Sequence, residues 1–488
     1  MERTTVLGAS VLRTLLPILF LFVPAVIAGQ SDYQHAAVLA VFTSVVLLWF
    51  TEALPLPVTG LLVPVLIALY GLMPPKAAFS AFGSDILFLF IGCFLLGRAM
   101  QKHGWDQRMA CWVFTQRFAT RSASMLIMVV SALAWVLSMW ISNTATCVML
   151  TPICLGIVRV LEPHFRSPKE QHSFTVRILL SCAFASTMGG LATPIGTPPN
   201  LLAIEFLEKQ GFSVSFFDWL QVGLPVSFFM MVLLHLLLRR LFPVSEVNLH
   251  EVRAHFVAEL KRRGPIRGEE LQVASVFLFA VSLWIAPGLS ESVLGKDHVI
   301  TTSLAPFSLS IVGILSAVVL FLLPTCHGKT HRTTNLTWND AQEIDWGTIL
   351  LFGGGISLGM LLGESGFALE LGSILLPEGV GITLIIIIAV ILSILLSEFA
   401  SNTASASVIY PILLAALVHS ELSPLATTLV LMAASFGASF GFMLPVSTPP
   451  NAIVYGTQKI PLRDMVRAGV CFDICGAALI IAWMLVLL

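Results

Sequence analysis

Apolar runs recur along almost the whole chain and constrain its fold more than any other feature. A helix that spans a bilayer needs about 20 consecutive, mainly apolar residues. Only 11% of the 488 residues are charged, against about 25% in soluble domains. Because lipid offers no partner to backbone polar groups, we expect an all-α polytopic membrane protein. Runs of suitable length predict eleven transmembrane helices, at residues 7–28, 36–53, 56–73, 85–101, 173–192, 216–241, 270–287, 302–323, 347–363, 424–444 and 466–487.

The beginning of the chain allows two interpretations. Arg3, Arg13 and the apolar run from Leu15 to Ala28 form a pattern that signal peptides share. Because many further spans follow, we interpret residues 1–35 as a first transmembrane helix.

Two other apolar regions are too long for one crossing. They cover residues 122–160 and 380–418, and each carries Ser-Asn-Thr near its middle. We expect both regions to be re-entrant helical hairpins, which enter and leave the membrane on the same side.

The positive charges test this topology, because Lys and Arg gather on the cytoplasmic side of membrane proteins. With a cytoplasmic N-terminus and two hairpins that do not cross, only Lys76, Lys209 and Lys296 fall outside, leaving 23 of the 26 Lys and Arg residues on the cytoplasmic side. The topology predicts a multi-pass protein of the plasma (cell inner) membrane whose C-terminus is extracytoplasmic. Residues 242–269 are polar and basic, and we expect a cytoplasmic connector helix there. The net charge of −1 gives no support for a nucleic-acid partner.

The two halves of the chain repeat the same features in the same order. Five predicted crossings separate the two Ser-Asn-Thr motifs, and an odd number places the copies in opposite orientations. We therefore expect inverted repeats at 36–241 and 270–488, each with a hairpin followed by a broken helix, at 173–208 and 424–458. Such repeats are typical of secondary transporters. The matched features are glycines 92, 97 and 104 against 354, 359 and 366; Ser142-Asn143-Thr144 against Ser401-Asn402-Thr403; TPIGTPPN (193–200) against LPVSTPPN (444–451); and Asp218 with Gly223 against Asp464 with Gly469.

The paired motifs offer hydroxyl and amide groups but no positive charge. Ser, Asn and Thr favour helix starts and turns, and paired prolines end one helix while the preceding Thr can begin the next. Helix N-termini bind anions through free N–H groups, and neutral oxygens suit a hard cation such as sodium. A single Ser-Asn-Thr is more often a local turn, but its repetition with TPPN favours a binding site. Glu398 lies three residues before Ser401, where it either acts in the site or braces the hairpin.

Other chemistry has little support in the sequence. The eight cysteines lie mostly in apolar runs without CxxC spacing, so we expect neither a disulfide framework nor a resident metal site. The histidines form no HExxH motif and no visible Ser-His-Asp set, so we do not expect an enzyme. A channel would need a continuous pore instead of two closed hairpins.

These residues resemble the divalent anion:sodium symporter family of sodium-coupled dicarboxylate, tricarboxylate and sulfate transporters. Both Ser-Asn-Thr motifs, both TPPN motifs, WFTEALPLPVTGLL (49–62) and DWGTILLFGGG (345–355) carry the resemblance, which covers nearly the whole chain. It implies a homodimer of eleven-span protomers and an elevator mechanism, in which the hairpins and broken helices carry the substrate past a fixed scaffold.

The resemblance also implies site residues. The first sodium ion would bind Ser138, Ser142, Asn143 and the backbone of Gly196, and the second Ser397, Ser401, Asn402 and the backbone of Ser447. The substrate would contact Asn143, Thr144, Thr197, Asn402, Thr403, Thr448 and Pro449. The family often has Thr where this chain has Ser397, and a smaller residue where it has Ser447; both changes keep the oxygen ligands.

The expected function is sodium-coupled import of a C4 dicarboxylate such as succinate, fumarate or malate. Sulfate or a tricarboxylate stays open, because Asn and Thr groups can bind any compact dianion. Exchange without sodium is the weaker alternative, since the complete neutral TPPN pattern is typical of symporters in the family.

Overall fold

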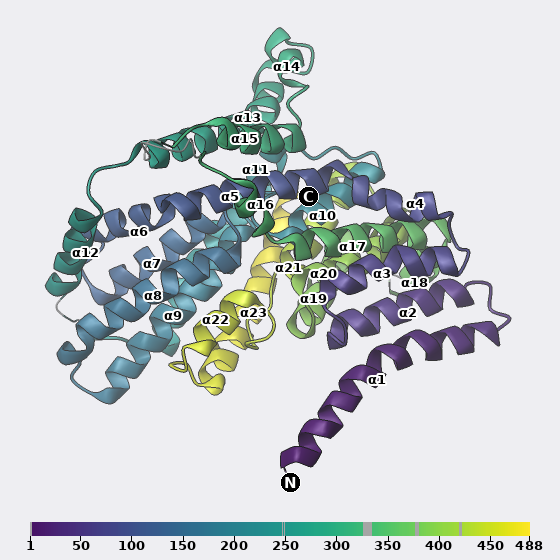
Figure 1. Ribbon diagram of the computed structural model, residues 1–488, viewed down its shortest axis with the longest axis horizontal. Coiled ribbons are helices and arrows are strands. Elements are labelled where there is room, and N and C mark those ends of the chain that lie inside the picture. The colour runs from purple at the N-terminus through teal and green to yellow at the C-terminus, as the bar shows by residue number, and fades with distance from the viewer. Residues whose placement is uncertain (1, 246, 248, 326–333, 376–379, 419–421) are drawn as a thin grey trace.

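The computed structural model describes residues 2–245, 247, 249–325, 334–375, 380–418 and 422–488, with side chains from Leu15 onward except at 375 and 418. Helices make up the regular structure of these residues, apart from one isolated β-bridge between Pro324 and Thr334. Figure 1 shows them packed into one body, from which α1 and the α13–α15 region project.

The helices follow one another with short connections. The first half contains α1 (Glu2–Gly29), α2 (Ala36–Thr51), α3 (Leu56–Leu69), α4 (Pro75–Ser80), η1 (Ala81–Gly83), α5 (Asp85–His103), α6 (Trp105–Thr115), α7 (Ala123–Ser138), α8 (Asn143–Leu161), η2 (Glu162–His164), α9 (Pro168–Gly190), α10 (Pro198–Lys209) and α11 (Phe216–Leu241). The second half contains α12 (His250–Arg263), α13 (Gly268–Leu294), α14 (Val299–Leu304), α15 (Leu309–Leu322), α16 (Trp338–Gln342), α17 (Trp346–Glu364), α18 (Phe367–Leu375), α19 (Ile382–Phe399), α20 (Asn402–Val418), α21 (Pro424–Ala438), α22 (Pro449–Gly456) and α23 (Leu462–Leu487).

Within the described residues, seven helical segments are long and apolar enough to cross a membrane. They are 75–103, 143–164, 216–241, 268–294, 346–364, 382–399 and 462–487. The chain is therefore an all-helical, polytopic membrane protein, as its apolar runs predict. Five of these segments contain predicted crossings, while the segments of α8 and α19 overlap the predicted hairpins. The expected total of eleven crossings stays a prediction, because several other apolar helices are shorter.

Two glycine contacts bring helices unusually close together. A Cβ atom at Gly354 on α17 would lie 2.4 Å from the Cα of Gly60 on α3, and a Cβ at Gly92 on α5 would lie 2.4 Å from the carbonyl carbon of Gly313 on α15. Small residues at a membrane helix interface let the two backbones approach. Gly92 and Gly354 are paired glycines of the sequence repeat, so the same kind of crossing occurs twice, each time between a helix of one half and a helix of the other.

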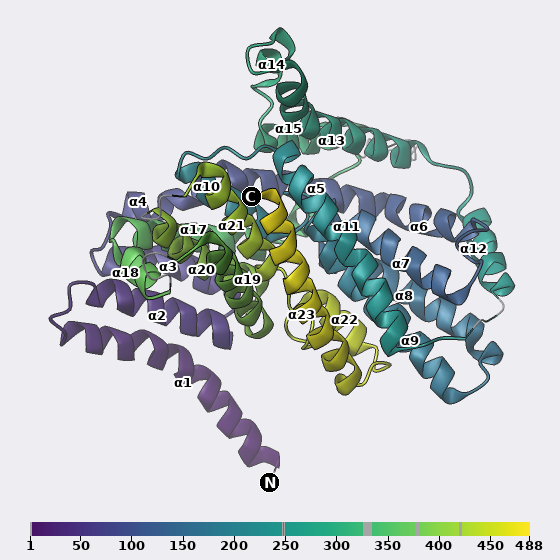
Figure 2. The same cartoon turned by 180° about the vertical axis from the view of Figure 1, so that it is seen from behind.

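Each half contains two successive pairs of helices, the first joined by a turn and the second separated by a break. α7 and α8 meet at residues 139–142, and α19 and α20 meet at residues 400–401; α9 and α10 are separated by 191–197, and α21 and α22 by 439–448. The halves also interlock, because α22 packs on α8 and α9 whereas α10 packs on α20 and α21 (Figure 2). Ser167 and Ser423, each followed by Pro, cap α9 and α21 by accepting the N–H of the residue three positions later.

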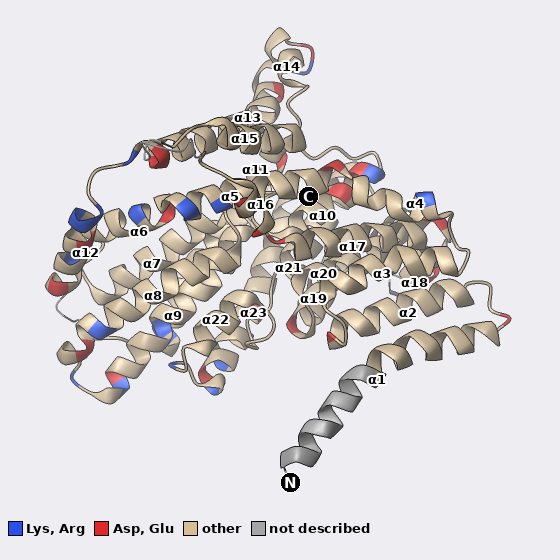
Figure 3. Cartoon of the chain, in the orientation of Figure 1, with Lys and Arg blue, Asp and Glu red and all other residues tan. Residues whose placement is uncertain are grey.

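The basic connector contains α12, which packs on α6 through stacked Phe114 and Phe256 rings 4.8 Å apart. Arg108 on α6 pairs with Glu270 at the start of α13, with Nε 2.5 Å from Oε2, and both side chains are largely buried. Figure 3 shows Lys and Arg gathered on the side of the molecule that carries α6, α12 and the start of α9, with few near α14. This asymmetry follows the charge distribution expected from the sequence.

Candidate functional site

The first Ser-Asn-Thr motif forms the turn between α7 and α8. The Ser138 hydroxyl, at the end of α7, donates to Oδ1 of Asn143 at 2.6 Å. Ser142 is the N-cap of α8, and its Oγ accepts the N–H of Ala145 at 3.2 Å. The motif thus ends one helix, starts the next and holds the Asn143 side chain across the turn.

The second motif repeats this geometry between α19 and α20. The Ser397 hydroxyl lies 2.8 Å from Oδ1 of Asn402 and 2.8 Å from the carbonyl oxygen of Ala438. Ser401 Oγ accepts the N–H of Ala404 at 3.2 Å. Two segments about 260 residues apart therefore build the same turn with the same side-chain contacts.

The asparagines of the two TPPN motifs hold the breaks in α9–α10 and α21–α22. Asn200 Nδ2 donates to the carbonyl oxygens of Gly190 at 2.9 Å and Thr193 at 2.8 Å. Asn451 Nδ2 donates to those of Gly441 at 2.9 Å and Leu444 at 3.1 Å. The sequence analysis did not predict this structural role of Asn200 and Asn451, although the asparagine that ends both TPPN motifs was a visible signal. A break buried in protein keeps carbonyl groups satisfied in this way.

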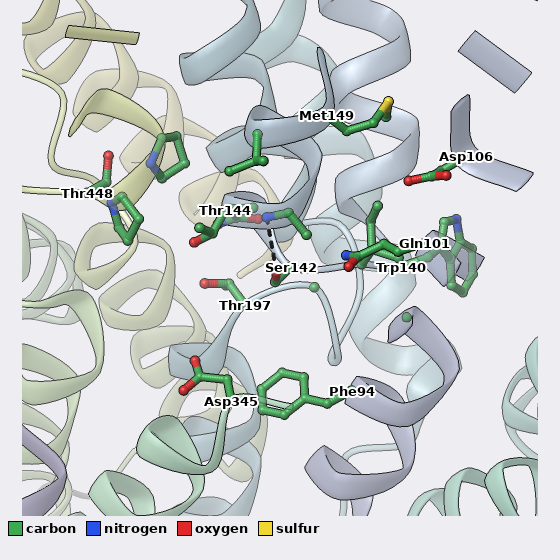
Figure 4. Close-up of a pocket in the computed structure, with 18 of the residues that line it drawn as sticks. Phe94, Gln101, Asp106, Trp140, Ser142, Thr144, Met149, Thr197, Asp345 and Thr448 are labelled. Carbon is green, nitrogen blue, oxygen red and sulfur yellow. Dashed lines mark hydrogen bonds between the residues drawn. The ribbon is translucent and has the colours of Figure 1, made fainter. Parts of the chain in front are cut away.

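Both turns and both breaks face one cavity of 1290 Å³. α8, α10, α20 and α22 all begin at residues that line it, so four helix N-termini converge there and favour a negative solute. Figure 4 shows Ser142, Thr144, Thr197 and Thr448 together in it. Of the predicted site residues, the structure brings eleven to the cavity wall: Ser142, Asn143, Thr144, Gly196, Thr197, Ser401, Asn402, Thr403, Ser447, Thr448 and Pro449. Ser138 and Ser397 lie behind the wall, buried beside Asn143 and Asn402.

Two oxygen atoms of the predicted first sodium ligands lie close to Gly190. A Cβ atom at Gly190 would lie 2.6 Å from Asn143 Oδ1 and 3.0 Å from the carbonyl oxygen of Gly196. Two neutral oxygens from different segments therefore converge over a residue that has no side chain. Such oxygens suit a hard cation, which the protein would carry as cargo.

Charged side chains also line the cavity, outside the four motifs. Arg98 and Arg263 line it, as do Glu52, Asp106, Glu259, Glu343 and Asp345. Arg98 pairs with Glu343. Burial raises the pKa of Asp106 on α6, although the N–H of Gln107, which donates to its Oδ1 at 2.8 Å, acts in the opposite direction. The motifs themselves contribute no positive charge, so an anion at the helix N-termini would be held by N–H groups, hydroxyls and amides.

Glu398 contacts the second break through several donors. Its Oε1 accepts the N–H groups of Phe442 at 2.7 Å and Met443 at 3.1 Å. The Ser447 hydroxyl lies 2.8 Å from both Oε2 and the carbonyl oxygen of Glu398. The sequence left two interpretations of Glu398, a role in the binding site or a structural role that braces the hairpin. These contacts support the structural role.

Comparison with known proteins identifies the family of the chain. The family model for the sodium:sulfate symporter transmembrane region matches residues 5–487. The chain is 33% identical over 472 residues to the sodium-dependent dicarboxylate transporter SdcS of Staphylococcus aureus, in strain USA300 and in strain NCTC 8325, covering 95% of this chain and 88% of the relative.

Two solved structures share the fold. They are the Alcanivorax borkumensis YdaH transporter, with a TM-score of 0.53 at 13% identity over 84% of this chain and 86% of that one, and Neisseria gonorrhoeae MtrF, with a TM-score of 0.53 at 13% identity over 83% and 81%. The family and these curated relatives are transporters, so the chain is a transporter and not an enzyme. It belongs to the sodium:sulfate symporter family, the divalent anion:sodium symporters that its paired motifs resemble.

Proposed function

We propose that the protein is a sodium-coupled symporter that imports a C4 dicarboxylate such as succinate, fumarate or malate across the cell inner membrane. The observation that carries this proposal is the convergence of two equivalent, uncharged Ser-Asn-Thr turns on one cavity. Four helix N-termini offer N–H groups to carboxylates, and the neutral oxygens beside Asn143 and Asn402 offer ligands to sodium. The relative SdcS is described as a sodium-dependent dicarboxylate transporter.

The sodium ions would supply the positive charge that the motifs lack. The first would bind at Ser138, Ser142, Asn143 and the backbone of Gly196, and the second at Ser397, Ser401, Asn402 and the backbone of Ser447. Asn143 and Asn402 would then contact both an ion and the dianion. This arrangement makes binding of the anion depend on prior or simultaneous binding of sodium.

The proposed movement is an elevator motion of two inverted repeats in a homodimer. The interlocked contacts of α22 with α8 and of α10 with α20 support a unit in which both hairpins and both broken helices move together. The cavity reaches α6 and α12 through Asp106, His255 and Arg263. Because these elements are expected in the cytoplasm, we interpret this conformation as open to the inside, with the N-terminus also cytoplasmic.

Uptake of labelled succinate into proteoliposomes tests the function. We expect accumulation with an inward sodium gradient and none when potassium replaces sodium. A hydrogen bond to a charged group contributes about 1.5–3 kcal/mol, so Asn143→Ala and Asn402→Ala should each lower uptake by about ten- to a hundredfold. Thr428→Ala, on α21 outside the cavity, is the matched control and should transport normally.

The same assay separates the alternatives. Competition by sulfate or citrate stronger than that by fumarate and malate would replace the dicarboxylate with one of those anions. Uptake that needs an internal dicarboxylate but no sodium would identify an exchanger and refute symport.

A further inference from the structure

An arginine lies buried between membrane helices, and no acidic group among the described residues pairs with it. Arg177 on α9 is 1% exposed, and its Nε has no hydrogen-bond partner. The ion pairs found in the described part of the chain do not include it. Because burying a charge is costly unless an opposite charge or hydrogen bonds compensate it, this position favours an anionic ligand.

Hydrogen bonds connect Arg177 to the two helices that pack beside α9, which are α7 and α11. Its Nη2 donates to Ser124 Oγ on α7 at 3.0 Å, and that oxygen lies 3.3 Å from Nε2 of His235 on α11. Because Ser124 Oγ accepts from Arg177, its own hydrogen is available to His235 Nε2, and the ring proton of a neutral His235 then lies on Nδ1. That nitrogen has no hydrogen-bond partner either. Two N–H donors on different helices therefore lack an acceptor.

A second arginine extends this group of donors to the surface. Arg239 lies in the last turn of α11, four residues after His235 and so on the same face of the helix. Arg177 is buried, His235 is half-buried and Arg239 is exposed. No ion pair of the described residues includes His235 or Arg239. These three residues, here called the basic cluster, therefore reach from the interior to the surface.

The three helices that form the cluster provide no acid to neutralise it. α7 contains neither Asp nor Glu. The one acid of α9 is Glu170, which lies in the first turn and accepts the N–H of Arg166 at 2.9 Å. The one acid of α11 is Asp218, which forms the capping box with Ser215 at the end of the helix opposite to Arg239. The counterion of the basic cluster must therefore come from another part of the chain or from a ligand.

The second repeat builds the equivalent positions without positive charge. Counted back from the asparagine that ends each TPPN motif, Thr428 takes the place of Arg177. Counted on from the matched glycines of α11 and α23, Ile481 takes the place of His235. The packing of these helices therefore does not require a basic group. Because the repeats are expected to be inverted, the cluster would occur on the cytoplasmic side of the protein and not on the other.

Exposed apolar side chains run along α11 next to the cluster. Phe228, Val232 and Leu236 follow one another at intervals of four residues and are 43%, 38% and 56% exposed. They form one row on the helix, here called the apolar row, which adjoins the row of His235 and Arg239. α11 lies on the side of the molecule seen in Figure 2. The end of the apolar row thus brings together a hydrocarbon-facing surface and unpaired basic groups.

We propose that the basic cluster binds the phosphate group of an anionic phospholipid in the cytoplasmic leaflet. Guanidinium and imidazole N–H groups form strong hydrogen bonds with phosphate oxygens, and the negative charge neutralises the buried arginine. The acyl chains lie along the apolar row, which favours a lipid over free phosphate. Basic pockets between transmembrane helices on the cytoplasmic side bind lipid head groups. This lipid site does not depend on which anion the protein transports.

Native mass spectrometry of the purified, full-length protein with added dioleoyl phosphatidylglycerol tests the site. We expect the protein to retain this lipid, and Arg177→Gln and Arg239→Gln each to weaken its binding by about tenfold or more, since each removes hydrogen bonds to a charged group. Arg239 is exposed, so its substitution should leave the packing intact. Arg159→Gln is the matched control, because Arg159 is also exposed in the last turn of a helix but lies outside the cluster. It should retain the lipid.

Two further ligands separate lipid from free phosphate and charge from general lipid affinity. Dioleoyl phosphatidylcholine, whose head group has no net charge, should be retained less than phosphatidylglycerol, and excess inorganic phosphate should not displace the bound lipid. Displacement by phosphate would show that the cluster binds a free anion and would overturn the lipid assignment. Equal retention of both lipids, a loss confined to Arg177→Gln, or an equal loss in Arg159→Gln would overturn the proposed site.

Discussion

Gly190 lies where the Asn143 side chain and the Gly196 carbonyl group converge. A methyl group there would lie 2.6 Å from Asn143 Oδ1 and 3.0 Å from the Gly196 oxygen, both closer than van der Waals contact. Because ion sites tolerate displacements of only about 0.5 Å, we expect Gly190→Ala to raise the sodium concentration for half-maximal uptake by about tenfold or more. Sodium titration of succinate uptake measures the change.

The second repeat provides the matched control for Gly190. A Cβ atom at Gly441 would lie 3.0 Å from the Cβ of Ser447 and 3.3 Å from the carbonyl oxygen of Ser397, so Gly441→Ala should have the smaller effect. A sodium requirement shifted equally by both variants, or by neither, would contradict the predicted first sodium site.

Site residues could be predicted from the sequence where the same motif occurs in both halves. Ser142, Asn143, Ser401 and Asn402 stand out because a polar triplet interrupts an apolar run in both halves. Glu398 has no counterpart in the first repeat, where Met139 stands, and one glutamate in an apolar helix says little about which groups it contacts. The N–H groups of Phe442 and Met443, which donate to it, belong to the second break, and spacing in the sequence cannot reveal that packing.

At the scale of elements, the crossing of α5 and α15 depends on Gly92. A methyl group there would lie 2.4 Å from the carbonyl carbon of Gly313, and backbone atoms cannot move aside as a flexible side chain can. Overpacking costs about 1–3 kcal/mol, so Gly92→Ala should lower the melting temperature of the purified protein, followed by tryptophan fluorescence. Gly363→Ala on α17, where a Cβ meets no atom within 4 Å, should leave it unchanged or higher. Equal melting temperatures for both variants would refute this close crossing.

Elements with strong apolar runs were predictable, because length and hydrophobicity alone determine whether a helix can span a bilayer. The turns at 139–142 and 400–401 and the breaks at 191–197 and 439–448 coincide with Ser-Asn-Thr and with the residues before TPPN, where capping and proline chemistry act locally. The short helices α4 and α16 escaped the sequence analysis, since five or six residues carry no periodic signal.

At the scale of the whole molecule, one sequence encodes every state of a transport cycle, and these states differ by only a few kcal/mol. The direction in which the cavity opens was therefore beyond prediction. Val148 on α8 lines the cavity and is 53% exposed. The side of the membrane from which position 148 can be labelled therefore shows the direction in which the cavity opens. We expect Val148→Cys to react with a membrane-impermeant maleimide from the cytoplasmic side in sodium-free, inside-out vesicles, above the background of the native cysteines.

A second valine, which we expect on the opposite side of the membrane, provides the control. Val299 at the start of α14 is 75% exposed and follows Lys296, which the charge distribution places outside. Val299→Cys should therefore react only from the extracytoplasmic side. Saturating sodium and succinate would shift the population toward the other state and slow labelling of Val148→Cys several-fold, while that of Val299→Cys stays constant. Labelling of Val148→Cys from the outside in sodium-free vesicles would reverse the proposed orientation, and labelling unaffected by sodium and succinate would contradict the elevator movement.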